Sequence, residues 1–405
     1  MRGFILYLLC VLVGCNTRLT PDATEDGGMW RQDAGLVYQS DVFIPPPDPQ
    51  NCSRDQAPAP GNGPAIILII GDGMGTEHIR AASLLRHGVP DGLVLQNAFQ
   101  HQGKINTSSL SGTTDSGAAA TAMGCGLKTI NYRVGLDAAG DACPNVFEMA
   151  HRRGFRTGVV TTAEVVDATP AGFALHQENR FAFTDLVQQL IALRPAVILG
   201  GGRQAFGTSD IERLRTGGHR YVRTASELNA LDTDCAVLGL FAEGAMEDAH
   251  TRSALSTQPT LVQMTKRALA VLEQSTGGFL LLIENEGIDN GSHRNDTESV
   301  LREVAELDDA VAEVVAWAGD REDVTIAVLA DHECGDLQVM DDAPTVSWGQ
   351  TSHSNVPIDI FASGPGTSVF DNEMRDNRWI YALVKSLIEN RPIQAPSDSA
   401  DNRTQ

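Results

Sequence analysis

Acidic and imidazole side chains follow several apolar runs of this chain, and together they have the ligand chemistry of a metal centre. Asp72 comes directly after the run Ala65–Ile70. The other candidates lie beside later apolar runs, and they are Glu284, Asp289, His293, Asp331, His332 and His353. Carboxylate and imidazole groups suit Zn²⁺, whereas a set of oxygens alone suits Mg²⁺. Taken singly, each of these residues could instead stabilise a turn or cap a helix.

Ser116 stands where a polar loop runs into a segment of small residues, Gly117–Gly126. Such a segment predicts a tightly packed helix with Ser116 at or next to its N-terminus. Backbone N–H groups and the helix dipole favour negative charge there, so this serine could carry an alkoxide or a phosphate. The alternative is that Ser116 only caps the helix, because serine is a favoured cap residue.

Further oxygen donors and a guanidinium lie between Thr161 and Arg180. This segment begins at the end of another apolar run and contains Asp167 and Thr169. Arginine can bind a phosphate through two parallel hydrogen bonds. Arg180 is therefore a candidate phosphate ligand, although by itself it could be a surface charge.

The apolar runs are short enough to be strands, and helical patterns separate most of them. The predicted strands are Ala65–Ile70, Thr157–Thr162, Ala196–Leu199, Phe279–Ile283, Thr325–Ala330 and Val356–Ala362. The predicted helices are Asn145–Arg153, Phe183–Leu193, Gln258–Gln274 and Asp296–Trp317. This alternation predicts an α/β fold, a three-layer sandwich with a mostly parallel central sheet and helices on both faces. Ligands of such sheets bind beyond the carboxyl ends of the strands, which is where the candidate metal ligands gather.

Six sequence motifs of the chain resemble those of the alkaline phosphatases, in the same order. They are GDGMG with Asp72, TDSGAAATAMGCGLKT with Ser116, DATPAGFALHQENR with Arg180, ENEGIDNGSH, ADH and SWGQTSH. The resemblance covers about residues 64–365. It implies zinc- and magnesium-dependent hydrolysis of phosphomonoesters through a phosphoserine intermediate on Ser116, with Arg180 holding the phosphate.

The resemblance also implies a cofactor set of two Zn²⁺ and one Mg²⁺. The implied ligands are Asp289, His293 and His353 for the first zinc, Asp72, Asp331 and His332 for the second, and Asp72, Thr169 and Glu284 for magnesium. Asp167 is expected to accept hydrogen bonds from magnesium-bound waters, and Asn290 is expected to lie at the substrate phosphate. Two divalent ions can stabilise the attacking and leaving oxygens of an in-line phosphoryl transfer together.

Departures from the family's pattern bear on assembly and on phosphate binding. Only twenty residues separate His332 from His353, so the surface subdomain that larger members insert there is expected to be nearly absent. No helical arm is predicted before the first strand, which favours a monomer or a weak dimer. Asn285 stands where the family usually has Gly, and Asn290 where it often has Lys or His.

Other functions on the same scaffold stay open. A phosphodiesterase would need room for a larger ester. A sulfatase would need a Cys/Ser-x-Pro-x-Arg motif, which does not occur around Ser116. A protein of a different class would be a catalytically silent lipoprotein that binds phosphate. The intact serine and the full ligand set favour the phosphomonoesterase.

The N-terminal segment predicts export. Arg2, a ten-residue apolar run and Leu12-Val13-Gly14-Cys15 resemble a lipoprotein signal peptide whose Cys15 is lipidated, with an ordinary cleaved signal peptide as the alternative. The predicted division is a signal peptide over 1–15, a disordered Pro- and Asp-rich tether over 16–63, a catalytic domain over 64–392 and a polar tail over 393–405. We therefore expect a lipid-anchored protein of the bacterial periplasm or outer membrane.

A formal net charge of −22 makes nucleic acids and anionic membrane surfaces poor partners. The expected partners are small phosphomonoesters, with no nucleic-acid binding and with membrane contact only through the lipid anchor. An acidic chain can bind phosphate only where metal ions or an arginine supply local positive charge.

The chain has seven cysteines, in a compartment that is predicted to allow disulfides. Setting aside Cys10 and Cys15 of the signal peptide leaves an odd number, so at least one is expected to be free or paired outside the domain. Cys125 and Cys143 bracket a short loop after the predicted Ser116 helix and are predicted to form a disulfide. The rival partners are Cys52, Cys235 and Cys334.

Overall fold

The structure of the protein is a computed structural model that describes residues 30–32, 35–37, 63–231, 235–340 and 345–396. The chain divides into two units, Met1–Phe43 and Ile44–Gln405, which are described separately. In the first unit, β1 (Trp30–Gln32) and β2 (Gly35–Val37) pair antiparallel. The predicted signal peptide, most of the predicted tether and most of the predicted tail lie outside the described residues.

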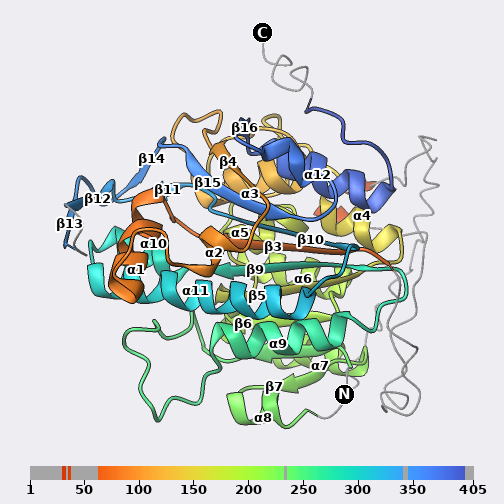
Figure 1. Ribbon diagram of the computed structural model, residues 1–405. Coiled ribbons are helices and arrows are strands. Elements are labelled where there is room, and N and C mark those ends of the chain that lie inside the picture. The colour runs from red at the N-terminus through yellow and green to blue at the C-terminus, as the bar shows by residue number, and fades with distance from the viewer. Residues whose placement is uncertain (1–29, 33–34, 38–62, 232–234, 341–344, 397–405) are drawn as a thin grey trace, which may run out of the picture. The chain divides into compact units, whose positions relative to one another are not determined.

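A ten-stranded sheet forms the centre of the second unit (Figure 1). In chain order its strands are β3 (Ala65–Gly71), β4 (His101–Asn106), β5 (Arg156–Glu164), β6 (Val197–Gly201), β7 (Arg220–Val222), β8 (Val237–Leu240), β9 (Phe279–Asn285), β10 (Val324–Leu329), β15 (Ile358–Ser363) and β16 (Met374–Asp376). Their spatial order is β16-β4-β15-β10-β3-β9-β5-β6-β8-β7. β15 is antiparallel to both its neighbours, and the other pairings are parallel. The sheet is therefore mostly parallel, as predicted.

Two small ladders fill the connection between β10 and β15. β11 (Glu333–Cys334) pairs antiparallel with β14 (His353–Ser354), and β12 (Leu337–Met340) pairs with β13 (Thr345–Trp348). In the first ladder Cys334 lies opposite His353. This pairing returns His353 to the segment that directly follows β10.

Helices cover both faces of the sheet (Figure 1). On one face α11 (Thr297–Ala318) packs against α1 (Thr76–His87) and α9 (Leu261–Leu272). On the other face α3 (Ser116–Cys125) packs against α5 (Ala168–Ala174) and α12 (Arg378–Glu389). The other helices are α2 (Val94–Asn97), α4 (Val146–Arg152), α6 (Phe183–Leu193), α7 (Thr208–Thr216), α8 (Ala225–Asn229), α10 (Gly287–His293), η2 (Arg203–Ala205) and η3 (Thr367–Phe370). The predicted three-layer α/β architecture is confirmed.

The predicted strands and helices are present with ends shifted by a few residues, and α6 has the predicted bounds. Strand β4 was not predicted, because its sequence HQGKIN has one fully buried side chain, Ile105, and gives no apolar run. No described helix combines the length and the apolar composition that a membrane span requires.

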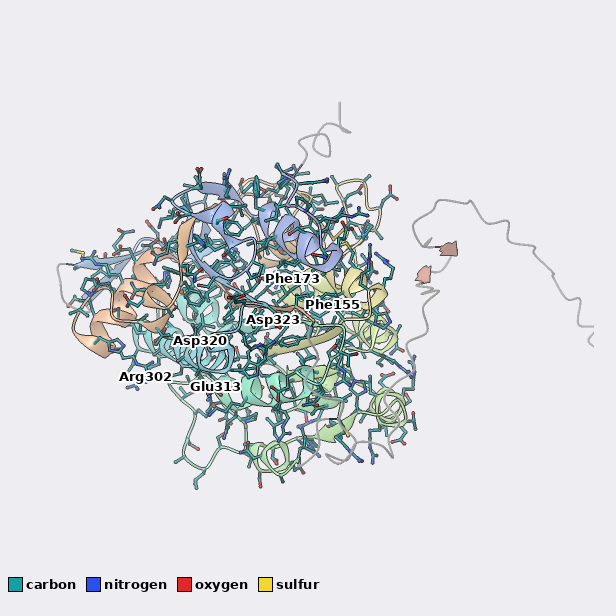
Figure 2. All side chains as sticks on the ribbon, turned by 45° about the vertical axis from the view of Figure 1, so that its right-hand side comes forward. Phe155, Phe173, Arg302, Glu313, Asp320 and Asp323 are labelled. Carbon is teal, nitrogen blue, oxygen red and sulfur yellow. A yellow bond between two sulfur atoms is a disulfide. The ribbon has the colours of Figure 1, made fainter. Side chains whose placement is uncertain are left out.

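Burial explains the sequence of the central strands. All seven residues of β3 are buried, because helices cover both faces of the sheet, and its sequence is accordingly a continuous apolar run. Phe173 of α5 lies in the interior, whereas Arg302 and Glu313 of α11 lie toward the surface (Figure 2). The amphipathic helices thus present one apolar face to the sheet.

The helices α3 and α5 approach each other closely at two glycines. A Cβ at Gly124 would lie 2.6 Å from the carbonyl oxygen of Gly172, and a Cβ at Gly172 would lie 2.6 Å from the Cβ of Ala120. Glycine at both positions lets the helix that carries Ser116 pack directly on the helix that carries Thr169.

A disulfide secures the end of α3. Cys125, the last residue of α3, is bonded to Cys143, so the predicted pairing is confirmed. Among the described residues Cys334 is a free and buried thiol, as the odd cysteine count required. A disulfide of this loop length typically stabilises a fold by about 2–4 kcal/mol.

Gly172→Ala should lower the free energy of unfolding by about 1–2 kcal/mol. Overpacking a tight contact costs about 1–3 kcal/mol, and the gain in helix propensity of at most about 1 kcal/mol does not offset it. Denaturant unfolding measures this. Gly244→Ala is the control, because a Cβ there would meet nothing nearer than 3.5 Å. Equal stability of the two variants would contradict the account of the α3–α5 contact.

Candidate active site

The carboxyl ends of adjacent strands bring the predicted metal ligands to one edge of the sheet. β10, β3 and β9 are neighbours. Asp72 follows β3, Glu284 lies at the end of β9, and Asp331 follows β10. Gly73 has a left-handed conformation (φ 72°), and a Cβ there would lie 2.6 Å from Oδ1 of Asp289. Glycine at this position therefore permits both the turn and the close approach of Asp289.

Asp289, His293 and His353, the first predicted group of ligands, lie together. Nε2 of His293 is 3.1 Å from Oδ2 of Asp289 and 3.1 Å from Nε2 of His353. The two Nδ1 atoms contact backbone carbonyls, that of Thr351 at 2.7 Å from His293 and that of Thr114 at 2.9 Å from His353. Because a carbonyl only accepts hydrogen bonds, each Nδ1 carries a proton. In the neutral imidazoles Nε2 then has its lone pair available for a metal ion.

Asp72, Asp331 and His332, the second predicted group, converge on Ser116. Nε2 of His332 lies 3.2 Å from Oδ2 of Asp331 and 3.6 Å from Oδ1 of Asp72. The same nitrogen is 3.3 Å from Oγ of Ser116. The rings of His332 and His353 stack with their centroids 3.6 Å apart, so the two groups adjoin.

Glu284 and Thr169 belong to the third predicted group. Thr161 Oγ1 donates to Oε2 of Glu284 at 2.6 Å. The hydroxyl of Thr169, on α5, is buried without a hydrogen-bond partner. Both side chains offer oxygen only, the donor that Mg²⁺ prefers.

Unpartnered polar atoms test whether these residues suit metal ions. The buried atoms of predicted ligands that make no hydrogen bond are Asp72 Oδ1, Asp289 Oδ1, Asp331 Oδ2, Thr169 Oγ1 and His332 Nδ1. Buried polar groups are rarely left without a partner, because their desolvation is costly. Ligand atoms of Asp289, His293 and His353 lie within 4.8 Å of one another, as do those of Asp72, Asp289 and His332. The types of donor atom in these side chains and the distances between them therefore suit divalent cations.

The carboxylates of the site oppose one another's ionisation. Burial, followed by the charge of Asp331, raises the pKa of Asp72 well above its usual range. Burial also raises the pKa of Glu284 to about 8, although the hydrogen bond from Thr161 opposes the shift. Asp289 differs, because burial would raise its pKa but the nearby imidazoles of His293 and His353 outweigh burial and hold the pKa well below the usual range. Bound cations would keep Asp72 and Glu284 ionised at neutral pH.

Ser116 is the first residue of α3, as predicted, but it does not cap the helix. The N-cap is Asp115, whose Oδ1 accepts a hydrogen bond from the backbone N–H of Ala118 at 2.9 Å. The alternative that Ser116 serves only as a cap is therefore wrong. Its hydroxyl faces His332 at the positive end of the helix dipole.

Arg180 is joined to the serine through Asp115. Its Nη1 donates to Oδ2 of Asp115 at 3.1 Å, and its Nη2 lies 3.5 Å from Oδ1 of Asp167. Burial opposes the charged form, but Asp167 and Asp115 raise the pKa of Arg180 above its ordinary value. The buried Nε–H has no partner. A charged guanidinium is thus held beside Ser116 with hydrogen-bonding capacity left for an anion.

Asp167 is the N-cap residue of α5, yet its side chain makes no capping hydrogen bond. Its carboxylate instead faces Arg180 and groups with Glu164 and Glu286. Asn290 is half-buried on α10, and among the described residues no hydrogen bond of its side chain is found. The assignment of Asn290 to the substrate phosphate stays a prediction.

Three residues of this site were not predicted to belong to it: Asp115, Glu286 and Cys334. Aspartate is a favoured cap residue directly before Ser116, so the sequence held a signal for Asp115. The thiol of Cys334 lies within 4.8 Å of ligand atoms of Asp289 and both histidines of the first group. Burial raises the pKa of this thiol. No spacing rule predicts it, because the β11–β14 ladder brings Cys334 to the site.

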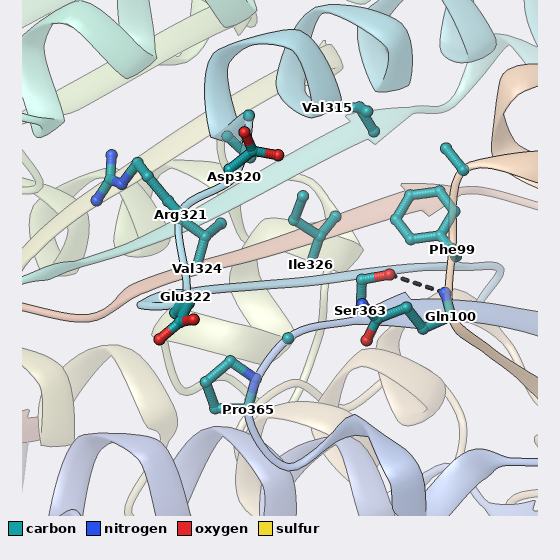
Figure 3. A pocket seen from close by; sticks show the side chains of 14 residues that line it. Phe99, Gln100, Val315, Asp320, Arg321, Glu322, Val324, Ile326, Ser363 and Pro365 are labelled. Carbon is teal, nitrogen blue, oxygen red and sulfur yellow. Dashed lines mark hydrogen bonds between the residues drawn. The ribbon is translucent and has the colours of Figure 1, made fainter.

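The pocket in Figure 3 lies at the opposite end of the strands. Val324, the first residue of β10, and Ser363, the last residue of β15, line it, and the backbone N–H of Gln100 donates to Ser363 Oγ at 2.9 Å. The predicted ligands instead lie beyond the other end of β10. This pocket is therefore separate from the candidate active site.

Comparisons with known proteins agree with this geometry. The family model described as alkaline phosphatase matches residues 64–339. Alkaline phosphatase 4 of Bacillus subtilis is 32% identical over 292 residues, which span 68% of this chain and 62% of that protein. The alkaline phosphatase of Escherichia coli is 30% identical over 326 residues, which span 66% of this chain and 69% of that protein. The chain belongs to the alkaline phosphatase family.

A solved structure supports the same relationship. The alkaline phosphatase of the Antarctic bacterium TAB5 is 25% identical, with a TM-score of 0.73 over 81% of this chain and 99% of that chain. A variant of that enzyme with a histidine replaced by aspartate is described with Mg bound in its M3 site. The present chain spans 62% of the length of the two Bacillus subtilis relatives that it matches.

The metal-free protein should lose stability as the pH rises from about 4.3, the usual pKa of a glutamate, through 8. Glu284 has a folded-state pKa of about 8, so the folded chain holds its proton more tightly than the unfolded chain, and the free energy of unfolding falls across that window. Urea unfolding with EDTA at a series of pH values measures this, and Glu284→Gln should reduce the slope. A slope that is the same in wild type and Glu284→Gln would contradict the assignment.

Proposed function

We propose that this chain is an alkaline phosphatase, a metal-dependent phosphomonoesterase in which Ser116 is the nucleophile. The observation that carries the proposal is the position of the Ser116 hydroxyl. It lies at a helix start, 3.3 Å from Nε2 of His332 and next to the Asp115–Arg180 pair. The family relationship supports the same reaction class, phosphoric monoester hydrolysis.

The chain's own residues account for most steps of the reaction. Arg180 binds two non-bridging oxygens of the phosphate dianion and orients phosphorus toward Ser116. Oγ of Ser116 gives up its proton and attacks phosphorus, the bond from phosphorus to the leaving oxygen breaks, and a phosphoserine forms. The leaving alkoxide takes up a proton and departs as the alcohol. Asp115 fixes Arg180 and caps the helix whose dipole faces the new negative charge. Water then attacks the phosphorus of the phosphoserine, the bond from phosphorus to Oγ breaks, and Oγ regains a proton as inorganic phosphate is released.

The proposed cofactors are two zinc ions and one magnesium ion. Asp289, His293 and His353 would hold the first zinc, Asp72, Asp331 and His332 the second, and Asp72, Thr169 and Glu284 the magnesium. When bound, such cations neutralise the phosphate and lower the pKa of a coordinated hydroxyl. The all-oxygen third group, with Asp167 nearby, favours magnesium there. The Mg described in a TAB5 variant that carries aspartate in place of histidine supports this choice.

We also propose that the protein is exported and lipid-anchored. The support for this proposal is the sequence of residues 1–15, with a lipobox-like end at Cys15, followed by the Pro-rich segment 16–63. A lipid-anchored enzyme in the periplasm or outer membrane would meet small phosphomonoesters there. The short connection between His332 and His353 supports a monomer or a weak dimer.

Ser116→Ala should reduce hydrolysis of p-nitrophenyl phosphate on the order of 10³-fold or more, because the covalent route is lost. The steady-state rate of nitrophenol release measures this.

EDTA should inactivate the wild type, and added zinc should restore its activity. The wild type should hydrolyse p-nitrophenyl phosphate faster than the diester bis-p-nitrophenyl phosphate. Preference for the diester would favour a phosphodiesterase, and no turnover with zinc and magnesium would favour a silent phosphate-binding protein.

Asp167→His should weaken the response of the zinc-loaded enzyme to magnesium. An imidazole beside the third group favours zinc over magnesium, whereas the native carboxylate can accept hydrogen bonds from magnesium-bound waters. A magnesium titration of the activity of each zinc-loaded protein gives the half-saturating concentration. Because Asp167 also contacts Arg180, Asp167→Asn serves as the matched control for that contact. A zinc-loaded wild type that ignores magnesium would contradict this assignment.

A further inference from the structure

Two exposed aromatic side chains stand beside the phosphate-binding arginine. Tyr132 and Phe181 are each 59% exposed, and they are the aromatic residues among the large exposed hydrophobic side chains of the described part of the chain. Their ring centroids are 6.3 Å apart at an interplanar angle of 44°. Exposed aromatic rings that lie together have apolar surface available for a ligand.

Backbone hydrogen bonds of Tyr132 and a ring contact of Phe181 place both residues next to the proposed catalytic groups. The backbone N–H of Tyr132 donates to Oδ2 of Asp115 at 3.0 Å, the same oxygen that accepts from Arg180. The backbone N–H of Arg180 donates to the carbonyl of Tyr132 at 2.9 Å. The guanidinium of Arg180 lies 5.3 Å from the centroid of the Phe181 ring. The backbone of Tyr132 and the ring of Phe181 therefore lie next to the arginine.

The backbone of Tyr132 has a conformation that is strained for a residue with a bulky side chain. Its φ is 71°, in the left-handed region that bulky residues rarely adopt. Glycine would fit this position without strain. A large ring that is both strained and exposed adds nothing to the core, and such outliers concentrate where function maintains them.

We propose that Tyr132 and Phe181 form a stacking surface for the organic part of the substrate, so that the enzyme favours phosphomonoesters carrying a planar aromatic group such as a nucleobase. This inference rests on the proposed phosphatase activity and specifies its substrate class. Arg180 holds the phosphate, and the rings stack on the aromatic group of the same ester. Stacking of this kind requires only a π-face and no particular hydrogen-bonding pattern.

A pair of substrates with the same leaving group isolates the contribution of stacking. Adenosine 5′-monophosphate and ribose 5-phosphate both lose a primary alkoxide, and they differ in the base. The wild type should show a kcat/KM for the nucleotide about tenfold above that for the sugar phosphate, the scale expected for one base–aromatic contact. The gain should appear mainly in KM, because stacking is equal in the ground and transition states.

The variants are compared by the ratio of kcat/KM for the nucleotide to kcat/KM for the sugar phosphate, and not by the rate with one substrate. Tyr132→Gly removes the ring at a position whose backbone suits glycine, and Phe181→Leu keeps the apolar bulk without a π-face. Both should bring the ratio close to one, whereas the matched control Tyr132→Phe should keep it. A wild-type ratio near one, or an equal fall for both substrates in the variants, would overturn the inference and indicate a merely structural role.

Failure of the underlying activity gives a different result. If neither ester is hydrolysed by the zinc- and magnesium-loaded wild type, the proposed phosphatase function itself is wrong. If the ratio is unchanged in Tyr132→Gly but sedimentation shows a smaller assembly, the two rings contact a second copy of the chain, and the substrate-stacking inference is overturned.

Discussion

Buried carboxylates crowded together at one edge of the sheet are the constraint on which the rest of this structure depends. Asp72, Asp331 and Glu284 are almost fully removed from solvent at one edge of a sheet. Burial and the charges of neighbouring carboxylates raise the pKa values of Asp72 and Glu284 and so disfavour their charged forms. A soluble fold retains such an arrangement only if something else supplies positive charge. Divalent cations do so with the donor types that are present, and the same cations can then bind a phosphate.

Close packing of helices keeps Ser116, the proposed nucleophile, at that edge of the sheet. Gly124 and Gly172 allow α3 and α5 to pack in direct contact. The Cys125–Cys143 disulfide holds the end of α3. Asp115 caps the other end of α3 by accepting a hydrogen bond from a backbone N–H of its first turn. Ser116 is therefore free of a capping role and faces His332. One buried carboxylate, Asp115, accepts hydrogen bonds from the serine helix, from Arg180 and from the backbone of Tyr132.

The sequence predicts the parts of this site that follow strand ends, and it misses the parts that depend on tertiary pairing. Asp72 and Asp331 follow continuous apolar runs, so their common edge could be inferred from a parallel sheet. Cys334 could not be placed, because the β11–β14 ladder that sets it opposite His353 has no periodic signal. Strand β4 was missed for a related reason, since Ile105 is its one fully buried residue and its sequence has no apolar run. The Cys125–Cys143 pair was predictable because its loop is short.

The most direct test of the account is to locate the phosphoryl group on the protein during turnover. The zinc- and magnesium-loaded enzyme would be quenched in acid with a phosphomonoester present, digested, and mapped by mass spectrometry. The account predicts a phosphorylated serine at position 116 in the peptide that begins α3. Phosphate on a different residue, or turnover by the intact enzyme with no phosphate trapped at Ser116 under any quench condition, would contradict it.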